Sequence, residues 1–529
     1  MKDILKHINK SRTLGVAAFL ISLSYMLSRV LGLVRDRLLA SNFGVSASTD
    51  AYTAAFRIPD LLFTILVSGA FAVSFIPVFI GYIEKKKAAE GWHIASSLLN
   101  IFSIATLSLA VIAFILAPYL VKVLAPGFDQ QRFELTVNLT RIMLITPFLF
   151  SISSVFGAVQ QSFNRFTLFA LASVFYNIGI IVGIIFFSKL FPAQPIYGVA
   201  YGVVFGTALQ TAVQIFGVIG LGWKYKFSFD FWHPGVIRVI KLMIPRSIDL
   251  AIDQFNYIIE TAIGSHLTVG SLSSYYYANN LKNVPLGIFG TAIATAVFPS
   301  LIRAAKSKDK SKLPRAIVTD MSLVLFFVVP SAAIAIVMRG YIVRLLFGFG
   351  DQATADTLGW LAGSIVATSM FFLVARIFYA LEDTLTPLLT SLSSIAINIF
   401  FSIILTKRFG VSGLGMALSI ATFYELILLM IILRFKIGDY GYRSITVVAS
   451  KLVIASLVMS GVMYLLILRV FPLYKADVGF LHIAPKFIVI SLVGVTVFFV
   501  LAKILRVAQA DIVLKRVLHP VKVLRRGRF

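Results

Sequence analysis

The chain has 529 residues, of which 59% are hydrophobic and only 13% are charged. Soluble globular domains carry about 25% charged residues, so this composition excludes a soluble protein and leaves no room for a large domain beside the membrane. The net charge of +26 does not indicate nucleic-acid binding. In membrane proteins Lys and Arg gather in the cytoplasmic loops, where they contact anionic lipid headgroups. The absence of cysteine excludes thiolate catalysis, and the six histidines lack the spacing of a transition-metal site.

Apolar runs long enough to cross a bilayer, roughly 20 residues each, occur fourteen times. The first run follows a basic start without a small-residue cleavage site, so it is interpreted as an uncleaved span. The predicted spans are residues 14–34, 51–82, 93–120, 136–161, 166–188, 196–221, 236–265, 274–302, 316–338, 357–381, 386–406, 412–434, 447–470 and 484–506. Pro59, Pro77 and Pro285 lie inside spans and predict kinks, because proline removes a helical hydrogen bond.

Basic residues follow every second predicted span. Lys85-Lys86-Lys87 follows the second span and a cluster from Arg303 to Arg315 follows the eighth, whereas the loop at 264–274 has no Lys or Arg. Because cytoplasmic loops carry the excess of Lys and Arg, the basic loops and both chain termini are predicted to be cytoplasmic.

A faint repeat relates Gly69–Pro77 in the second span to Gly290–Pro299 in the eighth, about 220 residues later. Such repeats are usual in transporters, with the substrate site between the halves. The sequence therefore predicts an all-α polytopic membrane protein with 14 transmembrane helices in two pseudo-symmetric six-helix lobes and two C-terminal helices. The predicted parts are residues 1–222 (helices 1–6), 223–436 (helices 7–12) and 437–529 (helices 13–14 and a basic tail).

The first two spans are rich in charge. Ionisable groups inside spans are costly and face a bundle interior or an aqueous cavity. Arg29 has apolar residues on both sides and is expected to face such a cavity, whereas Arg37 can reach the membrane surface from a helix end. The other charged residues of this region are Arg35, Asp36, Arg57 and Asp60.

The seventh span carries a polar stripe on one helical face. Its members are Asp249, Asp253, Asn256 and Glu260. Two interpretations stay open, namely ion pairs with arginines such as Arg57 or a site for a cation or proton. Asn398 and Ser402, four residues apart in the eleventh span, offer further oxygen ligands. No nucleotide-binding or hydrolase motif occurs, so an ion gradient or the membrane potential is expected to drive transport.

Several motifs resemble the MurJ/MviN lipid II flippase family. The matching runs are Ser28–Asp36, Thr49–Tyr52, Ala55–Leu62, Gly69–Pro77, Tyr276–Ala278, Pro285–Ile288, Phe298–Leu301 and Phe378–Pro387. They extend over predicted spans one to twelve, and the family also has fourteen spans.

The resemblance implies the fold of the multidrug/oligosaccharidyl-lipid/polysaccharide exporters, with two six-helix lobes around an alternately opened cavity and a groove for a polyprenyl tail. It implies a transporter rather than an enzyme, in the bacterial inner membrane. The implied cargo is lipid II, an undecaprenyl pyrophosphate carrying a disaccharide-pentapeptide, which arginines can bind through charge-assisted hydrogen bonds. Membrane lipids and cell-wall synthesis proteins are further implied partners. No cofactor is expected other than a bound Na⁺ or proton.

The resemblance also assigns residues. The family's basic residues in the first two spans fall on Arg29, Arg35 and Arg57, with Asp36 beside them, whereas two further family arginines are replaced by Thr64 and Asn280. Asn280 is kept in the predicted substrate site. The predicted cation site consists of Glu260, Asp253, Asp249, Asn398 and Ser402.

Three alternatives to a lipid II flippase remain. The two missing arginines favour a flippase for another polyprenyl-linked glycan or a drug exporter of the same fold. The third alternative, from another class, is a transport-inactive membrane scaffold that organises cell-wall synthesis.

Overall fold

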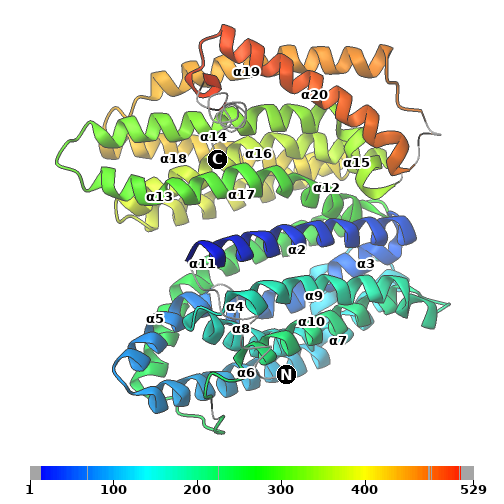
Figure 1. Ribbon diagram of the computed structural model, residues 1–529. Coiled ribbons are helices and arrows are strands. Elements are labelled where there is room, and N and C mark those ends of the chain that lie inside the picture. The colour runs from blue at the N-terminus through cyan, green and yellow to red at the C-terminus, as the bar shows by residue number, and fades with distance from the viewer. Residues whose placement is uncertain are drawn as a thin grey trace, which may run out of the picture. The chain divides into compact units, whose positions relative to one another are not determined.

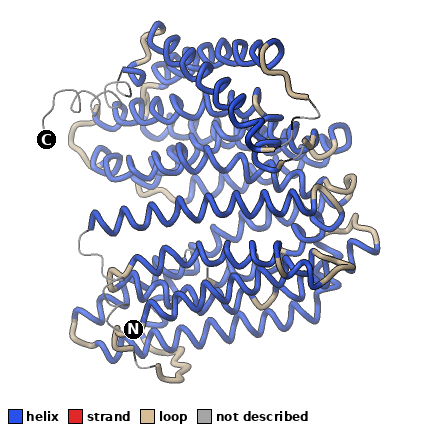
Figure 2. Tube along the Cα trace, turned by 45° about the vertical axis from the view of Figure 1, so that its right-hand side comes forward, coloured by secondary structure: helices blue, strands red, loops and turns tan. Residues whose placement is uncertain are grey.

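The computed structural model describes residues 14–67, 70–223, 225–348, 350–474, 477, 479–511 and 513. Figure 2 shows that these residues form helices joined by loops. Twelve helical segments in this part of the chain are long and apolar enough to cross a membrane. The helices α2 (Leu14–Phe43) and α11 (Pro234–Ser265) are also of spanning length, which brings the number to the predicted fourteen.

The chain divides into two compact units, Met1–Ser273 and Ser274–Phe529. The predicted boundary between the lobes, at residues 222 and 223, lies before α11, whereas the division of the structure lies after it. The reason is that α11 packs on α4 (Arg57–Leu66), α5 (Ala70–Glu84) and α6 (Ala88–Leu124) of the first unit.

The second predicted span is broken into α3 (Ala47–Ala55), α4 and α5 (Figure 1). Pro59 lies in the first turn of α4, where its missing N–H leaves no helical hydrogen bond unmade. Pro77 lies inside α5. The remaining elements of the first unit are α7 (Gln130–Met143), α8 (Thr146–Ser162), α9 (Phe166–Ile185), η1 (Phe187–Leu190) and α10 (Ile196–Val218).

Glycines allow α9 and α10 to approach at backbone distance. A Cβ atom added at Gly179 would lie 2.1 Å from the Cα of Gly206, and one added at Gly183 would lie 2.5 Å from the Cα of Gly202. Small residues four apart on each helix are the usual means of close helix packing in membranes, where van der Waals contact replaces the hydrophobic effect. This interface therefore leaves no space for any side chain at these positions.

The second unit contains the remaining helices. They are α12 (Ser271–Pro285, which begins in the first unit), η2 (Leu286–Thr291), α13 (Ala292–Ala305), α14 (Lys312–Val337), α15 (Arg339–Phe347), α16 (Gln352–Ala380), α17 (Leu385–Phe409), α18 (Ser412–Ile437), α19 (Tyr442–Arg469) and α20 (Phe480–Ile504). At the kink predicted for Pro285 the helix passes into the π-helical segment η2. The core of this unit lies around α14 and α16, and α19 packs on α14.

Asp383 joins the start of α17 to the end of α18. Its carboxylate accepts hydrogen bonds from the backbone N–H and hydroxyl of Thr386, at 3.0 and 2.7 Å, and from Lys436 Nζ at 2.5 Å. Burial raises the pKa of Asp383, but the hydrogen bonds from Lys436 and Thr386 outweigh it and hold the pKa at about 2. Because this pKa lies below the ordinary value of 3.8, the carboxylate stabilises the fold above that pH and the stabilisation is lost between about 4 and 2.

Asp383→Asn is therefore expected to lower the free energy of unfolding by about 1 kcal/mol at neutral pH, the net contribution of a hydrogen bond. The difference from the unmodified protein should shrink as the pH falls from about 4 to 2. Melting of the purified protein in detergent at several pH values measures both. Glu382→Gln is the matched control, because Glu382 is 80% exposed and meets Lys306 only at 3.6 Å. An equal effect of both substitutions would show that the hydrogen bonds of Asp383 do not stabilise the fold.

Candidate substrate and cation sites

Arg35 and Asp36 form a polar junction between α2 and α9. The Arg35 guanidinium donates to Asp36 Oδ1 at 2.7 and 3.0 Å and to Asn177 Oδ1 at 3.2 Å. Asn177 in turn donates to the Ser28 hydroxyl at 3.2 Å. Asp36 is buried, and the Arg35 side chain keeps 20% of its surface exposed. The structure thus brings these two predicted substrate residues together and adds Asn177, which the sequence did not single out.

Arg29 lies on α2, six residues before Arg35, and is exposed. The polar contact of Asn177 with Ser28 fixes the same turn of α2 against α9. The expectation that Arg29 faces an aqueous cavity stays a prediction.

Arg57 begins α4 and lies against α11. Its Nε donates to Thr261 Oγ1 at 3.1 Å, and its guanidinium carbon lies 5.1 Å from the centre of the Tyr257 ring. Among the described residues, Thr261 is the one hydrogen-bond acceptor for this guanidinium. An arginine has five N–H donors, so the two terminal amino groups of Arg57 can donate to an anion, while the Asp60 carboxyl one turn later on α4 interacts with its charge.

Glu260 precedes Thr261 on α11 and is buried, with 4% of its surface exposed. Asn256, one turn earlier, donates to Glu260 Oε1 at 3.0 Å. The structure therefore places the predicted cation residue Glu260 one position from the contact of Arg57. Asp249 and Asp253 belong to the same helix, but their side chains lie outside the described part of the chain.

The other predicted site residues belong to the second unit, whereas Thr64, where the family resemblance places an arginine, belongs to the first. Asn398 and Ser402 are both buried in α17, with Ser402 Oγ 3.5 Å from Asn398 Oδ1. Asn280 is half-buried on α12. Thr64 is buried on α4. The joining of Asn398 and Ser402 to Glu260 stays a prediction, as does the place of Asn280 in the substrate site.

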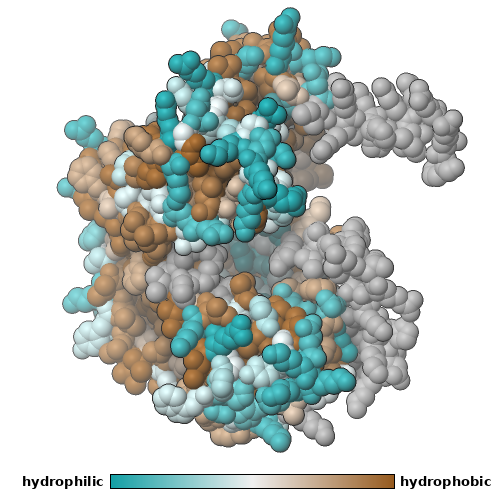
Figure 3. Space-filling view, turned by 90° about the vertical axis from the view of Figure 1, so that its left-hand side faces the viewer, coloured by the Kyte–Doolittle hydropathy of each residue, from teal (hydrophilic) through white to brown (hydrophobic). Residues whose placement is uncertain are grey.

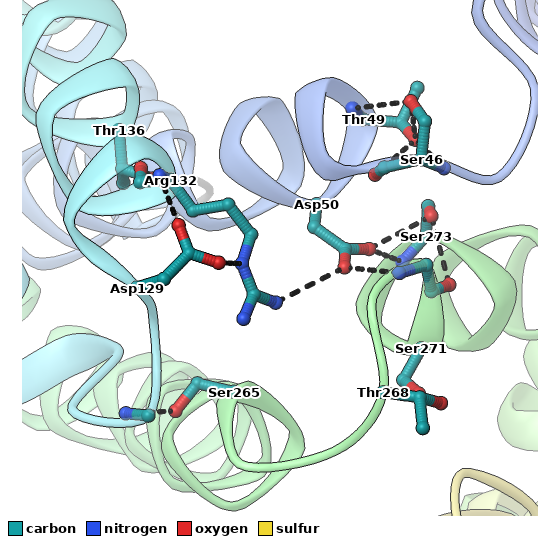
Figure 4. A network of polar contacts seen from close by, with 12 residues as sticks. Ser46, Thr49, Asp50, Asp129, Arg132, Thr136, Ser265, Thr268, Ser271 and Ser273 are labelled. Carbon is teal, nitrogen blue, oxygen red and sulfur yellow. Dashed lines mark hydrogen bonds and ion pairs between the residues drawn. The ribbon is translucent and has the colours of Figure 1, made fainter.

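Asp50 is a buried carboxylate at the centre of a network that the sequence did not assign to a site (Figure 4). It accepts hydrogen bonds from the backbone N–H groups of Gly270 and Ser273, at 2.6 and 2.8 Å, and from the Ser273 hydroxyl at 2.9 Å. Gly270 has a φ of +93°, and a Cβ atom there would lie 2.4 Å from Val45. The carboxylate thus binds the N-terminal turn of α12, where the helix dipole favours negative charge.

Arg132 completes this network from α7. One of its amino groups lies 4.0 Å from Asp50 Oδ2, and its Nε donates to Asp129 at 2.7 Å. Ser265 at the end of α11 accepts the Gly127 N–H at 3.0 Å. The network therefore fixes the loop between α11 and α12 to α3 and to the start of α7. A signal in the sequence was present, since Asp50 stands in the Thr49–Tyr52 motif.

The arrangement of helices resembles that of solved membrane transporters. A structure of a multidrug resistance MATE family transporter of the MOP superfamily, in an inward-facing conformation, matches with a TM-score of 0.65, 14% identity and coverage of 80% of this chain and 99% of that one. A structure titled lipid II flippase MurJ, inward closed conformation, matches with a TM-score of 0.76, 23% identity and coverage of 92% of this chain and 98% of that one. At these identities the matches establish the fold.

The family follows from the sequence comparisons. The model of the family described as "Lipid II flippase MurJ" matches residues 39–483. A probable lipid II flippase MurJ from Buchnera aphidicola subsp. Acyrthosiphon pisum (strain APS) is 29% identical over 417 residues, which cover 77% of this chain and 81% of the relative. The chain therefore belongs to the MurJ family of multi-pass membrane transporters.

Proposed function

We propose that the chain is a flippase that moves the lipid-linked peptidoglycan precursor lipid II from the cytoplasmic to the outer leaflet by alternating access. Membership of the MurJ family supports this proposal. The observation that carries it is Arg57, whose two terminal amino groups meet no acceptor among the described residues.

The chemistry of the cargo suits this arginine. A pyrophosphate offers paired anionic oxygens, and a guanidinium can donate two parallel hydrogen bonds to them. The Tyr257 ring and the Thr261 hydroxyl hold Arg57 through a cation–π contact and the Nε hydrogen bond. The side chain is thereby ordered before the cargo arrives, which lowers the entropy lost on binding.

Replacement of Arg57 tests the proposal in a strain depleted of its own lipid II flippase. The unmodified chain should restore growth and lipid II transport, whereas Arg57→Gln should retain at most roughly a tenth of the transport, because a hydrogen bond to a charged group contributes about 1.5–3 kcal/mol. Arg57→Lys keeps the charge without the paired donors and should lie between the two.

Arg141→Gln is the matched control for Arg57. Arg141 also lies in a span, but it donates to the Phe114 carbonyl at 3.3 Å and lies 5.1 Å over the Phe114 ring. Each variant is first shown to reach the membrane in equal amount. Normal growth and transport with Arg57→Gln would overturn the assigned role of Arg57, and failure of the unmodified chain would overturn the function.

A second candidate is a flippase for another polyprenyl-linked glycan. The specific observation is that Thr64 is buried and Asn280 half-buried where the family resemblance places arginines. Transport of a different polyprenyl-linked glycan, with none of lipid II, favours this candidate. Growth restored by a chain that transports neither lipid II nor the other glycan would favour the transport-inactive membrane scaffold.

We further propose that a cation or proton gradient drives the cycle through Glu260. A buried carboxylate has its charge disfavoured by desolvation, and a bound cation or proton relieves that cost. Glu260 is buried, and Asn256 donates to its Oε1. Binding of the ion in one state and release in another would give the differential affinity that coupling requires.

Glu260→Gln is expected to reduce gradient-dependent lipid II flipping in proteoliposomes while leaving lipid II binding almost unchanged. Glu425→Gln is the matched control, because Glu425 is also a buried carboxylate in a span and accepts a hydrogen bond from Ser391 at 2.5 Å. Flipping by Glu260→Gln at the normal rate under the same gradient would show that Glu260 has no coupling role.

The bacterial inner membrane is the proposed location, with both termini cytoplasmic. The exposed basic residues between α13 and α14 support this orientation, since positive charge remains on the cytoplasmic side. Cell-wall synthesis proteins are proposed partners on the basis of the family alone.

A further inference from the structure

A cavity of about 470 Å³ lies in the first unit where α5 turns into α6 and where α11 begins. Its polar lining consists of Tyr82, Lys85, Lys87, Glu90, His233 and Arg238. Figure 3 faces this end of the helices and shows hydrophilic surface gathered there among apolar surface. The cavity is separate from Arg35, Arg57 and Glu260, none of which lines it.

The local sequence builds this cationic lining. The N–H of Lys86 bonds to the Ile83 carbonyl at 3.1 Å and the N–H of Lys87 bonds to the Tyr82 carbonyl at 3.0 Å, the pattern of a Schellman C-cap. Lys86 occupies the left-handed position of this motif, with a φ of 59°, where glycine is usual. The tight turn leaves Lys85 and Lys87 on the cavity.

The start of α11 supplies the opposite wall. His233 Nδ1 accepts the Gly235 N–H at 3.1 Å and so caps the helix. Arg238 follows just over one turn after His233, which brings its side chain to the same cavity. The first turns of α6 and α11 both lie at the cavity, and helix N-termini favour negative charge.

The charges of the lining do not balance. Lys85, Lys87 and Arg238 face one acidic residue, Glu90, which pairs with Lys87 at 3.1 Å. We propose that this cavity binds a phosphate group, whose oxygens would accept from Lys85 and Arg238 and from the Tyr82 hydroxyl. The ligand chemistry is that of a phosphate ester of a membrane lipid or of a soluble phosphate.

An aromatic segment beside the cavity, residues 225–232, favours a membrane lipid as the source of the phosphate group. From Tyr225 to Phe231 aromatic and polar residues alternate. This segment bonds to α6, with Asn100 donating to the Ser228 carbonyl at 2.9 Å and His93 lying 3.1 Å from Asp230. Phe227 is 73% exposed and Trp232, which follows the alternating residues, is 86% exposed, whereas Phe229 packs on the core of the unit. Exposed aromatic residues of this kind mark the depth of lipid headgroups.

The test measures binding of phosphatidylglycerol and of phosphatidylcholine to the purified full-length protein by native mass spectrometry. The double variant Lys85→Gln/Arg238→Gln should bind phosphatidylglycerol roughly tenfold more weakly, since each cation near an anionic headgroup adds attraction. The control is Lys407→Gln/Arg408→Gln, which removes the same charge from the exposed last turn of α17, outside the basic loops, and should change binding less than about twofold. If the double variant fails to fold, Lys85→Gln alone is compared with Lys407→Gln alone.

Inorganic phosphate distinguishes the two sources. Displacement of phosphatidylglycerol by millimolar phosphate from the unmodified protein, but not from the double variant, would show that the phosphate group alone is recognised. Binding of the lipid that phosphate does not displace, yet that the double variant loses, would show that the lipid is the ligand. Equal losses in the double variant and in the control, or no loss in either, would overturn the proposal.

Discussion

Alanine at Gly179 is expected to destabilise the protein by about 3 kcal/mol, the upper end of the usual cost of overpacking. The added Cβ would lie 2.1 Å from Gly206 Cα and 2.4 Å from Gly206 N. Both atoms are backbone, so no side chain can turn away and α9 must separate from α10. The helices are held by van der Waals contact over this surface, and the separation removes that contact along much of their length.

Gly461→Ala is the matched control for Gly179→Ala. Gly461 lies in the middle of α19, and a Cβ atom there meets nothing within 4 Å. Alanine has the better helix propensity, so the control should melt at the same temperature as the unmodified protein or slightly above it. Melting in detergent and the amount of protein in the membrane are the two measurements. A Gly179→Ala protein as stable as the control would show that α9 and α10 are not in backbone contact.

Asparagine at Asp50 is expected to cost about 3 kcal/mol of stability, in the range for disruption of hydrogen bonds to a buried charged group. The three donors around Asp50 are the N–H groups of Gly270 and Ser273 and the Ser273 hydroxyl. The asparagine amide has one acceptor oxygen and one NH₂ group. Its NH₂ group must therefore face an N–H or O–H donor that the carboxylate oxygen had accepted. The α11–α12 loop then loses its hold on α3, and transport should fail with it.

Two further variants show whether the loss comes from this network. Ser273→Ala removes only the hydroxyl donor and should cost about 1 kcal/mol, the net contribution of a single hydrogen bond. Asp309→Asn changes a carboxylate that bonds only within its own exposed loop, to Ser311, and should leave the melting temperature unchanged. An Asp50→Asn protein as stable as Asp309→Asn would exclude a structural role for the buried carboxylate.

The number and approximate limits of the spans could be predicted because hydropathy has a direct physical cause. A segment in the bilayer must be apolar and must satisfy its own backbone hydrogen bonds, so each span is a helix of a minimum length. Glu260 could be selected in the same way, since a buried acid in an apolar helix is rare. The pairing of Arg35 with Asn177 could not be predicted, because the two residues are 142 positions apart in the chain and polar residues occur in many spans.

What the sequence by itself determined is therefore the membrane class, the fourteen helices and, through its motifs, the family. Only the tertiary structure decided that α11 packs with the first unit and that Asp50 binds the start of α12. The partners of Asp50 lie 220 and 223 positions away and include backbone N–H groups, which every residue except proline possesses. Such groups leave no mark in the sequence, so their contribution becomes visible only when the fold brings them to the carboxylate.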